Sequence, residues 1–225
     1  MIVAFSNRID AENEHSEVRD ALAHDWSSFS SRMGFIPISI PNAFERTDKF
    51  LSKTNVQAIF LTGGGTCPSD INDFDTENKL RNITEYRCIE YALKNNIPLI
   101  GVCRGFQLIN IYFKGRVTKN FGKLIDGKIN HVNKEITISY SEHPKLPGVS
   151  PGQYKVLCFN DDGILHQDLA EGLDCIATSE NERVVESFVH KNFRILGIQW
   201  HPEREDGLSE FNRNIVNAFL REKEK

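Results

Sequence analysis

In the first half of the chain, short apolar runs alternate with longer amphipathic stretches, and this pattern constrains the fold most. The apolar runs lie at residues 2–5, 35–40, 58–61 and 97–102. Runs of this length that end at Gly, Pro or polar residues are typical of buried strands. Strands that alternate with helices in this order pair in parallel, joined by right-handed crossovers. We therefore expect a mostly parallel sheet with helices on both of its faces.

Two of the intervening stretches carry apolar residues at helical spacing. We expect one helix over Val18, Leu22, Trp26, Phe29 and Met33 and a second over Leu80, Ile83, Tyr86, Ile89 and Leu93. Gly34 follows the first stripe, where a helix end favours a positive φ. A third helix is predicted over residues 104–113.

The second half of the chain has a different pattern. Five short β-like runs lie at 135–140, 154–159, 173–178, 183–189 and 194–200, and a last helical stripe carries Phe211, Ile215, Phe219 and Leu220. The fold class expected is α/β, a three-layer α/β/α sandwich around a mostly parallel sheet, with a small antiparallel β extension. We expect one domain over residues 1–225.

Composition excludes several classes of protein. An apolar content of 40% and a net charge of −4 are ordinary for a globular chain and argue against disorder and against a nucleic-acid partner. No apolar run approaches the roughly 18 residues of a membrane span, and the run at 2–5 is too short for a secretory signal. The five cysteines contain no Cys-x-x-Cys pair, which favours free thiols and a cytoplasmic location.

One of the cysteines has the sequence context of a nucleophile. Cys103 follows an apolar run, precedes a predicted helix, and is flanked by Gly101 and Gly105. This is the layout of a nucleophile elbow, in which a tight turn holds the nucleophile at a helix N-terminus. A buried structural cysteine is the alternative. Cys67, beside the glycine loop, is a weaker candidate that could face solvent; the other three lie in predicted helix or strand.

A base for this thiol is predicted at the end of the last strand. His201 follows the run 194–200, and Glu203 is close enough in sequence to orient the imidazole. Together with Cys103 they would form a Cys-His-Glu triad. A surface turn is the alternative. Four further histidines show no metal-ligand spacing, so neither a zinc site nor another metal is expected: His131, His143, His166 and His190.

Two glycine-containing segments have the composition of anion sites. Gly63-Gly64-Gly65 follows a predicted parallel strand and could offer backbone N–H groups to an oxyanion, although such runs also simply make turns. Residues 122–128 have the spacing of a phosphate loop. Ile129 follows them where Ser or Thr would be needed, so we interpret this segment as a basic turn.

Taken together, these motifs resemble the class I glutamine amidotransferase superfamily, which has a flavodoxin-like fold, and its stand-alone γ-glutamyl hydrolase branch (peptidase C26-like). The resemblance implies that Cys103 is the nucleophile, His201 the general base and acid, and Glu203 its orienting group. It further implies substrate contacts from the backbone of the glycine loop and of the elbow, and from one amide side chain: Gly64, Gly65, Arg104 and Gln107. The implied reaction releases glutamate through a γ-glutamyl thioester without any cofactor.

The N-terminal segment gives a finer resemblance. Ser6-Asn7-Arg8-Ile9-Asp10 and the stretch to residue 37 are similar to γ-glutamyl-CDP-amidate hydrolases, which serve phosphoramidate decoration of surface polysaccharide. This implies a nucleotide-linked small molecule as substrate. Asn7, Arg8 and Asp10 follow the first strand at its carboxyl end, so they could face the site, with an ordinary polar loop as the alternative.

Two departures from the branch leave other substrates open. Asn160 stands where the branch usually has His, and the loop over 65–70 is longer than usual. The alternatives are a γ-glutamyl-aminobutyrate or γ-glutamyl-polyamine hydrolase, a glutaminase subunit that delivers ammonia to a separate synthase, and a non-catalytic binding protein. A homodimer is also open.

Overall fold

The structure is a computed structural model that describes residues 1–11, 17–42, 44–70, 78–125, 131–204 and 209–221. Within these residues the helices are α1 (His24–Met33), α2 (Thr47–Lys53), α3 (Lys79–Asn95), α4 (Arg104–Tyr112), α5 (Phe121–Ile125) and α6 (Glu210–Arg221), with a 3-10 turn at His166–Asp168. The strands are β1 (Ile2–Ser6), β2 (Arg8–Asp10), β3 (Arg19–Ala21), β4 (Ile36–Ile40), β5 (Ala58–Leu61), β6 (Leu99–Val102), β7 (His131–Tyr140), β8 (Gly152–Asn160), β9 (Ile164–Leu165), β10 (Leu173–Ser179), β11 (Val184–His190) and β12 (Ile195–Ile198).

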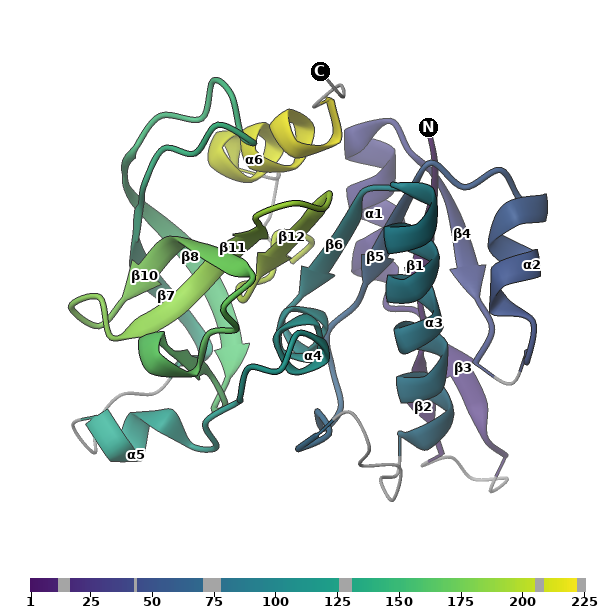
Figure 1. Cartoon of the computed structure of the whole chain (residues 1–225), viewed down its shortest axis with the longest axis horizontal. Helices are drawn as coiled ribbons and strands as arrows, with labels where there is room; N and C mark the ends of the chain where they lie inside the picture. Colours follow the sequence, from purple (N-terminus) through teal and green to yellow (C-terminus); the bar gives the residue numbers. More distant parts are fainter. Residues whose placement is uncertain (12–16, 43, 71–77, 126–130, 205–208, 222–225) are drawn as a thin grey trace.

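One mixed sheet runs through the described part of the molecule, in the order β4-β1-β5-β6-β12-β11-β10-β7-β8, with β9 beside β11. Every pairing from β4 to β12 is parallel, and every pairing from β12 to β8 is antiparallel. Figure 1 shows the antiparallel end as a separate lobe beside the helix-covered parallel part. The expected fold class, with its antiparallel extension, is confirmed.

Helices cover both faces of the parallel strands because side chains alternate between the faces along each strand. Phe5 and Phe60 pack with α1 and α6 in one apolar core, whereas Ala4, Ile59 and Leu61 pack with α2, α3 and α4 in the other. The three layers leave the carboxyl ends of the strands at one edge of the sheet. Loops that follow β1, β5, β6 and β12 meet there, and this edge holds the candidate site.

Strand β12 belongs to the parallel part of the sheet. Its residues pair in parallel with β6, Ile198 opposite Val102, and antiparallel with β11. The sequence predicted a strand here but did not indicate its neighbour. This pairing places the segment after Ile198 beside the segment after Val102.

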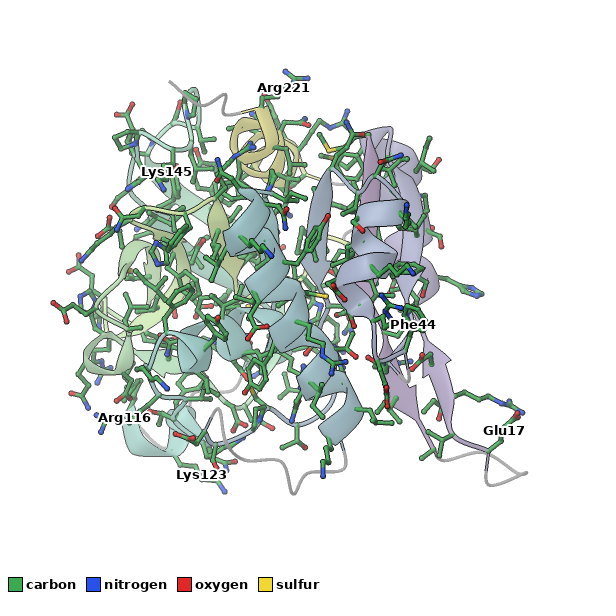
Figure 2. All side chains as sticks on the ribbon, turned by 45° about the vertical axis from the view of Figure 1, so that its right-hand side comes forward. Glu17, Phe44, Arg116, Lys123, Lys145 and Arg221 are labelled. Carbon is green, nitrogen blue, oxygen red and sulfur yellow. The ribbon has the colours of Figure 1, made fainter. Side chains whose placement is uncertain are left out.

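The first helix is shorter than the hydrophobic stripe predicted. Val18 is 66% exposed, and residues Arg19–Ala21 form β3, which pairs with β2 in a small ribbon. The helix begins at His24, after an extended Ala23. The prediction of a helix from Val18 is therefore wrong, because pairing with β2 replaces the helical turn. Figure 2 shows Glu17 at the far end of this ribbon, away from the body of the molecule.

Helix α3 was predicted, and Tyr86 and Ile89 of its apolar stripe are buried, but its buried face also includes charged residues. Leu80 is 47% exposed, whereas Arg81 and Glu85 are fully buried. Helices α2 and α5 were not expected. The segment 122–128 begins in α5, and its residues 126–128 lie outside the described part of the chain.

Candidate active site

Cys103 occupies a strained turn between β6 and α4. Its backbone has φ 53° and ψ −103°, a region that residues with a side chain seldom adopt. Gly105 makes the turn possible, because a Cβ atom there would lie 2.2 Å from the carbonyl oxygen of Leu61. Gly101 is equally confined, with a Cβ position 2.6 Å from the backbone of Gly105. The geometry is that of a nucleophile elbow, with the sulfur at the N-terminus of α4.

The pairing of β12 with β6 brings His201 to this elbow. The backbone N–H of Cys103 donates to the carbonyl oxygen of Ile198 (2.8 Å), and that of His201 donates to Leu157 of β8 (2.9 Å). Gly63 packs directly against both residues and leaves no room for a side chain of its own. A Cβ atom there would lie 2.8 Å from Cε1 of His201 and 3.2 Å from Cβ of Cys103. Three strand ends therefore converge on one thiol and one imidazole.

Glu203 holds the imidazole from its other side. Its Oε1 lies 2.6 Å from Nδ1 of His201, and both side chains are 2% exposed. A carboxylate at this position favours the tautomer with the proton on Nδ1 and stabilises the imidazolium. The remaining nitrogen, Nε2, is then the one available for proton exchange with the thiol.

The two groups perturb each other's ionisation. Burial opposes the thiolate of Cys103, but the charge of His201 and a hydrogen bond with it bring the pKa of the thiol below its usual value. Burial likewise opposes the imidazolium, yet Cys103 and Glu203 together raise the pKa of His201 to about 9. The arrangement favours a thiolate–imidazolium pair, which can attack a carbonyl carbon and then protonate a leaving group.

The other cysteines lack this activation. Cys67, the weaker sequence candidate, is 4% exposed rather than solvent-facing, and burial raises the pKa of its thiol to about 12. Burial also raises the pKa of Cys88, Cys158 and Cys175. Cys103 alone among the five thiols has a lowered pKa.

A buried ionic network supports the glycine loop and the elbow. Glu85 of α3 accepts from Nε of Arg81 (2.9 Å) and from Nη1 of Arg104. Arg81 also donates to the carbonyl oxygens of Gly64 (2.6 Å) and Thr62 (2.7 Å). The side chain of Arg104 therefore points into the protein, and only its backbone can serve the site. The sequence did not indicate Arg81 and Glu85 as functional residues; their i, i+4 spacing was the available signal.

A pocket of about 390 Å³ opens over Cys103 and His201. Its other lining residues are Gly64, Gly65, Thr66, Arg104, Gln107, Asn120, Phe159, Asn160, Asp161, Asp162 and Arg204. The volume falls in the lower part of the range for small-molecule sites. One of the lining residues, Arg204, is a cation. Its guanidinium lies 4.3 Å from the ring centre of Phe159, which also lines the pocket.

The predicted substrate residues differ in where they lie. Gly64, Gly65 and Gln107 line the pocket, although the side-chain amide of Gln107 donates to Asp162 (2.9 Å) and Gln199 (3.1 Å). Asn7 does not line it: its amide donates to Ile40 (3.0 Å), and its oxygen accepts from Ser39 (2.6 Å).

Arg8 lies beside the glycine loop. It lines a smaller neighbouring pocket with Glu203 and Arg204, and its Cδ lies 3.7 Å from the Cβ position of Gly64. Asn160 lines the main pocket, and its amide donates to Asp162 (3.0 Å). Its Oδ1 is buried and has no hydrogen-bond partner in the described part of the chain.

Comparisons with known proteins show which family the chain resembles in sequence and in fold. The profile of the family described as Peptidase C26 matches residues 1–203. A glutamine amidotransferase-like protein, YvdE, of Lactococcus lactis is 33% identical over 183 residues, 74% of each chain. The γ-glutamyl-CDP-amidate hydrolase of Campylobacter jejuni is 29% identical over 216 residues, 93% of each chain. The crystal structure of a glutamine amidotransferase from Thermotoga maritima has a TM-score of 0.64 at 18% identity, and the match covers 90% of this chain and 76% of that one.

No helix among the described residues is both long and apolar enough to cross a membrane.

Proposed function

This chain belongs to the peptidase C26 family of cysteine-dependent amide hydrolases, and from that premise we propose that it hydrolyses a γ-glutamyl amide through a thioester on Cys103. The observation that carries the proposal is the position of Cys103, held at a strained elbow beside a His201 that Glu203 orients. Binding alone would require neither the strain nor a thiol of lowered pKa.

The reaction follows from these groups. The thiolate of Cys103 attacks the γ-carbonyl carbon of the substrate and forms a tetrahedral oxyanion. The backbone N–H groups of Gly64 and Arg104 stabilise this oxyanion, assisted by the positive end of α4. The imidazolium of His201 gives its proton to the leaving amine as the C–N bond breaks, which leaves a γ-glutamyl thioester. His201 then takes a proton from water, the resulting hydroxide attacks the thioester, and glutamate leaves as the thiolate reforms.

The leaving group that we propose is a nucleotide-linked amidate, so that the substrate is γ-glutamyl-CDP-amidate and the product cytidine diphosphoramidate. Two features support this choice: the extent of the match to the Campylobacter jejuni hydrolase, and two cations in or beside the pocket, whose lining also includes Asp161 and Asp162. Arg204 lines the pocket, and Lys119 lies beside it, paired with Asp162 at 2.8 Å. Such cations can neutralise a diphosphate.

A substrate panel tests the proposal. The purified chain is assayed for glutamate release from γ-glutamyl-CDP-amidate, γ-glutamyl-aminobutyrate, a γ-glutamyl-polyamine and glutamine. Cys103→Ala should reduce release by several orders of magnitude. The matched control Cys175→Ala, at a thiol outside the pocket, should not.

The outcomes separate the alternatives. The highest kcat/KM for γ-glutamyl-CDP-amidate supports the nucleotide substrate, and a preference for another γ-glutamyl amide rejects that substrate while keeping the mechanism. Turnover of glutamine that appears only with an added synthase identifies an ammonia-delivering subunit. Unchanged turnover in Cys103→Ala contradicts the mechanism itself.

A further inference from the structure

Three side chains with metal-ligating atoms meet in the antiparallel lobe, outside the pocket over Cys103. They are His131 of β7, Cys158 of β8 and Glu186 of β11, and one ligand atom from each lies within 4.8 Å of the other two. All three residues are buried, with exposed fractions of 2%, 0% and 0%. Local sequence spacing indicated no such site, because the three residues come from different strands.

Strand pairing explains why two of these side chains lie close together. His131 pairs with Asn160, and Cys158 lies two residues along β8, so it is a diagonal neighbour of His131 on one face of the sheet. Glu186 comes from β11, which is separated from β7 by β10. Its carboxylate nevertheless lies close to both side chains.

Two atoms of the cluster are buried without hydrogen-bond partners. In the described part of the chain, neither Nδ1 of His131 nor Oε2 of Glu186 has one. Nε2 of His131 lies 3.0 Å from a carboxylate oxygen of Glu180. This contact places the ring proton on Nε2 and leaves the lone pair of Nδ1 directed into the cluster. A carboxylate behind the imidazole is the arrangement that commonly orients metal-bound histidines.

The charges of the cluster suit a divalent cation. Glu186 accepts from Ser179 (2.6 Å) but forms no ion pair with a lysine or arginine of the described ranges. Burial raises the pKa of the Cys158 thiol and that of the Glu186 carboxyl, so the cluster carries two negative charges only when a bound metal displaces both protons. A divalent ion would neutralise them in an apolar setting, where the ring of Phe121 packs 5.1 Å from that of His131.

We propose that His131, Cys158 and Glu186 form a binding site for a divalent transition metal of the zinc class. The ligand atoms are Nδ1, Sγ and a carboxylate oxygen, a mixed set that zinc accepts, with water in the fourth position. Metal–ligand bonds of about 2.0–2.3 Å in a tetrahedron separate the ligand atoms by roughly 3.5 Å. The observed 3.6 Å between Nδ1 of His131 and Oε1 of Glu186 is close to this separation. Binding releases the protons of the Cys158 thiol and of the Glu186 carboxyl to solvent.

Such a site would brace the scaffold behind the catalytic histidine. It would link β7, β8 and β11, and Leu157 of β8, the residue before Cys158, accepts the backbone hydrogen bond of His201. Cys158 also packs in the same core as Cys103. A test must therefore exclude metal bound at the active-site thiol.

The experiment uses Co²⁺ as the probe and the full chain carrying Cys103→Ala. After treatment with a chelator, the protein is titrated with Co²⁺. The expected result is a thiolate-to-cobalt charge-transfer band that saturates at one ion per chain. Adding Cys158→Ser, a substitution of similar size, should remove the band, whereas the matched control Cys175→Ser should keep it.

A further variant tests the orienting carboxylate without disturbing the core. Glu180 is partly exposed, at 29%, so Glu180→Gln should fold. It should weaken Co²⁺ affinity about 10- to 100-fold, the usual effect of losing such a partner. Absence of the band in the Cys103→Ala protein, or its persistence after Cys158→Ser, overturns the proposal. Neither readout depends on γ-glutamyl hydrolysis, so the two proposals can fail separately.

Discussion

Nη1 of Arg81 donates a hydrogen bond of 2.6 Å to the carbonyl oxygen of Gly64, which ties helix α3 to the loop that faces the nucleophile. Glu85 joins this arginine to Arg104, the first residue of α4. The two backbone segments proposed to bind the oxyanion are thus fixed relative to each other by one buried carboxylate.

Removing that carboxylate should destabilise the fold. Glu85→Ala leaves two guanidinium groups buried without their counter-charge, so we expect the free energy of unfolding to fall by about 3–5 kcal/mol. Urea denaturation measures the change. The control is Glu135→Ala, which breaks an exposed pair with Lys155 and should cost less than about 1 kcal/mol. Equal losses in the two variants would contradict a structural role for the network.

Arg81→Lys should separate positioning from stability. Lysine keeps the positive charge beside Glu85 but cannot reproduce the fork that holds the carbonyl oxygens of Thr62 and Gly64. We expect kcat to fall by up to about 100-fold with a smaller change in KM, because a displaced loop weakens the oxyanion contacts. Steady-state kinetics, with circular dichroism as the folding check, test this. A rise in KM alone would show that the loop serves substrate binding instead.

The activity should depend on pH with two limbs. On the acid side kcat/KM falls as the thiolate of Cys103 takes up a proton, and the lowered pKa of this thiol extends activity below the usual range of a cysteine. On the alkaline side it falls near pH 9, where the imidazolium of His201 loses the proton needed by the leaving amine. The two limbs belong to the coupled pair. A profile that still rises above pH 9 would exclude an imidazolium acid.

Glu203→Gln should change both the rate and this profile. The carboxylate raises the pKa of His201, so its loss should move the alkaline limb to lower pH. The amide can also favour the wrong imidazole tautomer, which in comparable triads lowers kcat by up to about 10⁴-fold. Rates measured across pH for both proteins test this. An unshifted alkaline limb would show that Glu203 does not control the imidazole.

The predictions from sequence were strongest where the signal was local. The elbow around Cys103 could be recognised because a tight strand-to-helix turn requires Gly101 and Gly105 within four residues of each other. The helix predicted from Val18 failed for the opposite reason. The apolar spacing identified the helix from His24 onward, but pairing between β2 and β3 decided the conformation of residues 19–21.

By itself, the sequence determined the α/β alternation, the elbow and the short His201–Glu203 motif, because each depends on residues near one another in the chain. Only the tertiary structure decided that β12 lies parallel to β6, which brings His201 to Cys103 across 98 positions. It also decided that Arg81 and Glu85 are buried and that Cys158 meets Glu186. Strand partners are chosen by hydrogen bonds and packing between distant segments, and local hydrophobic periodicity does not encode that choice.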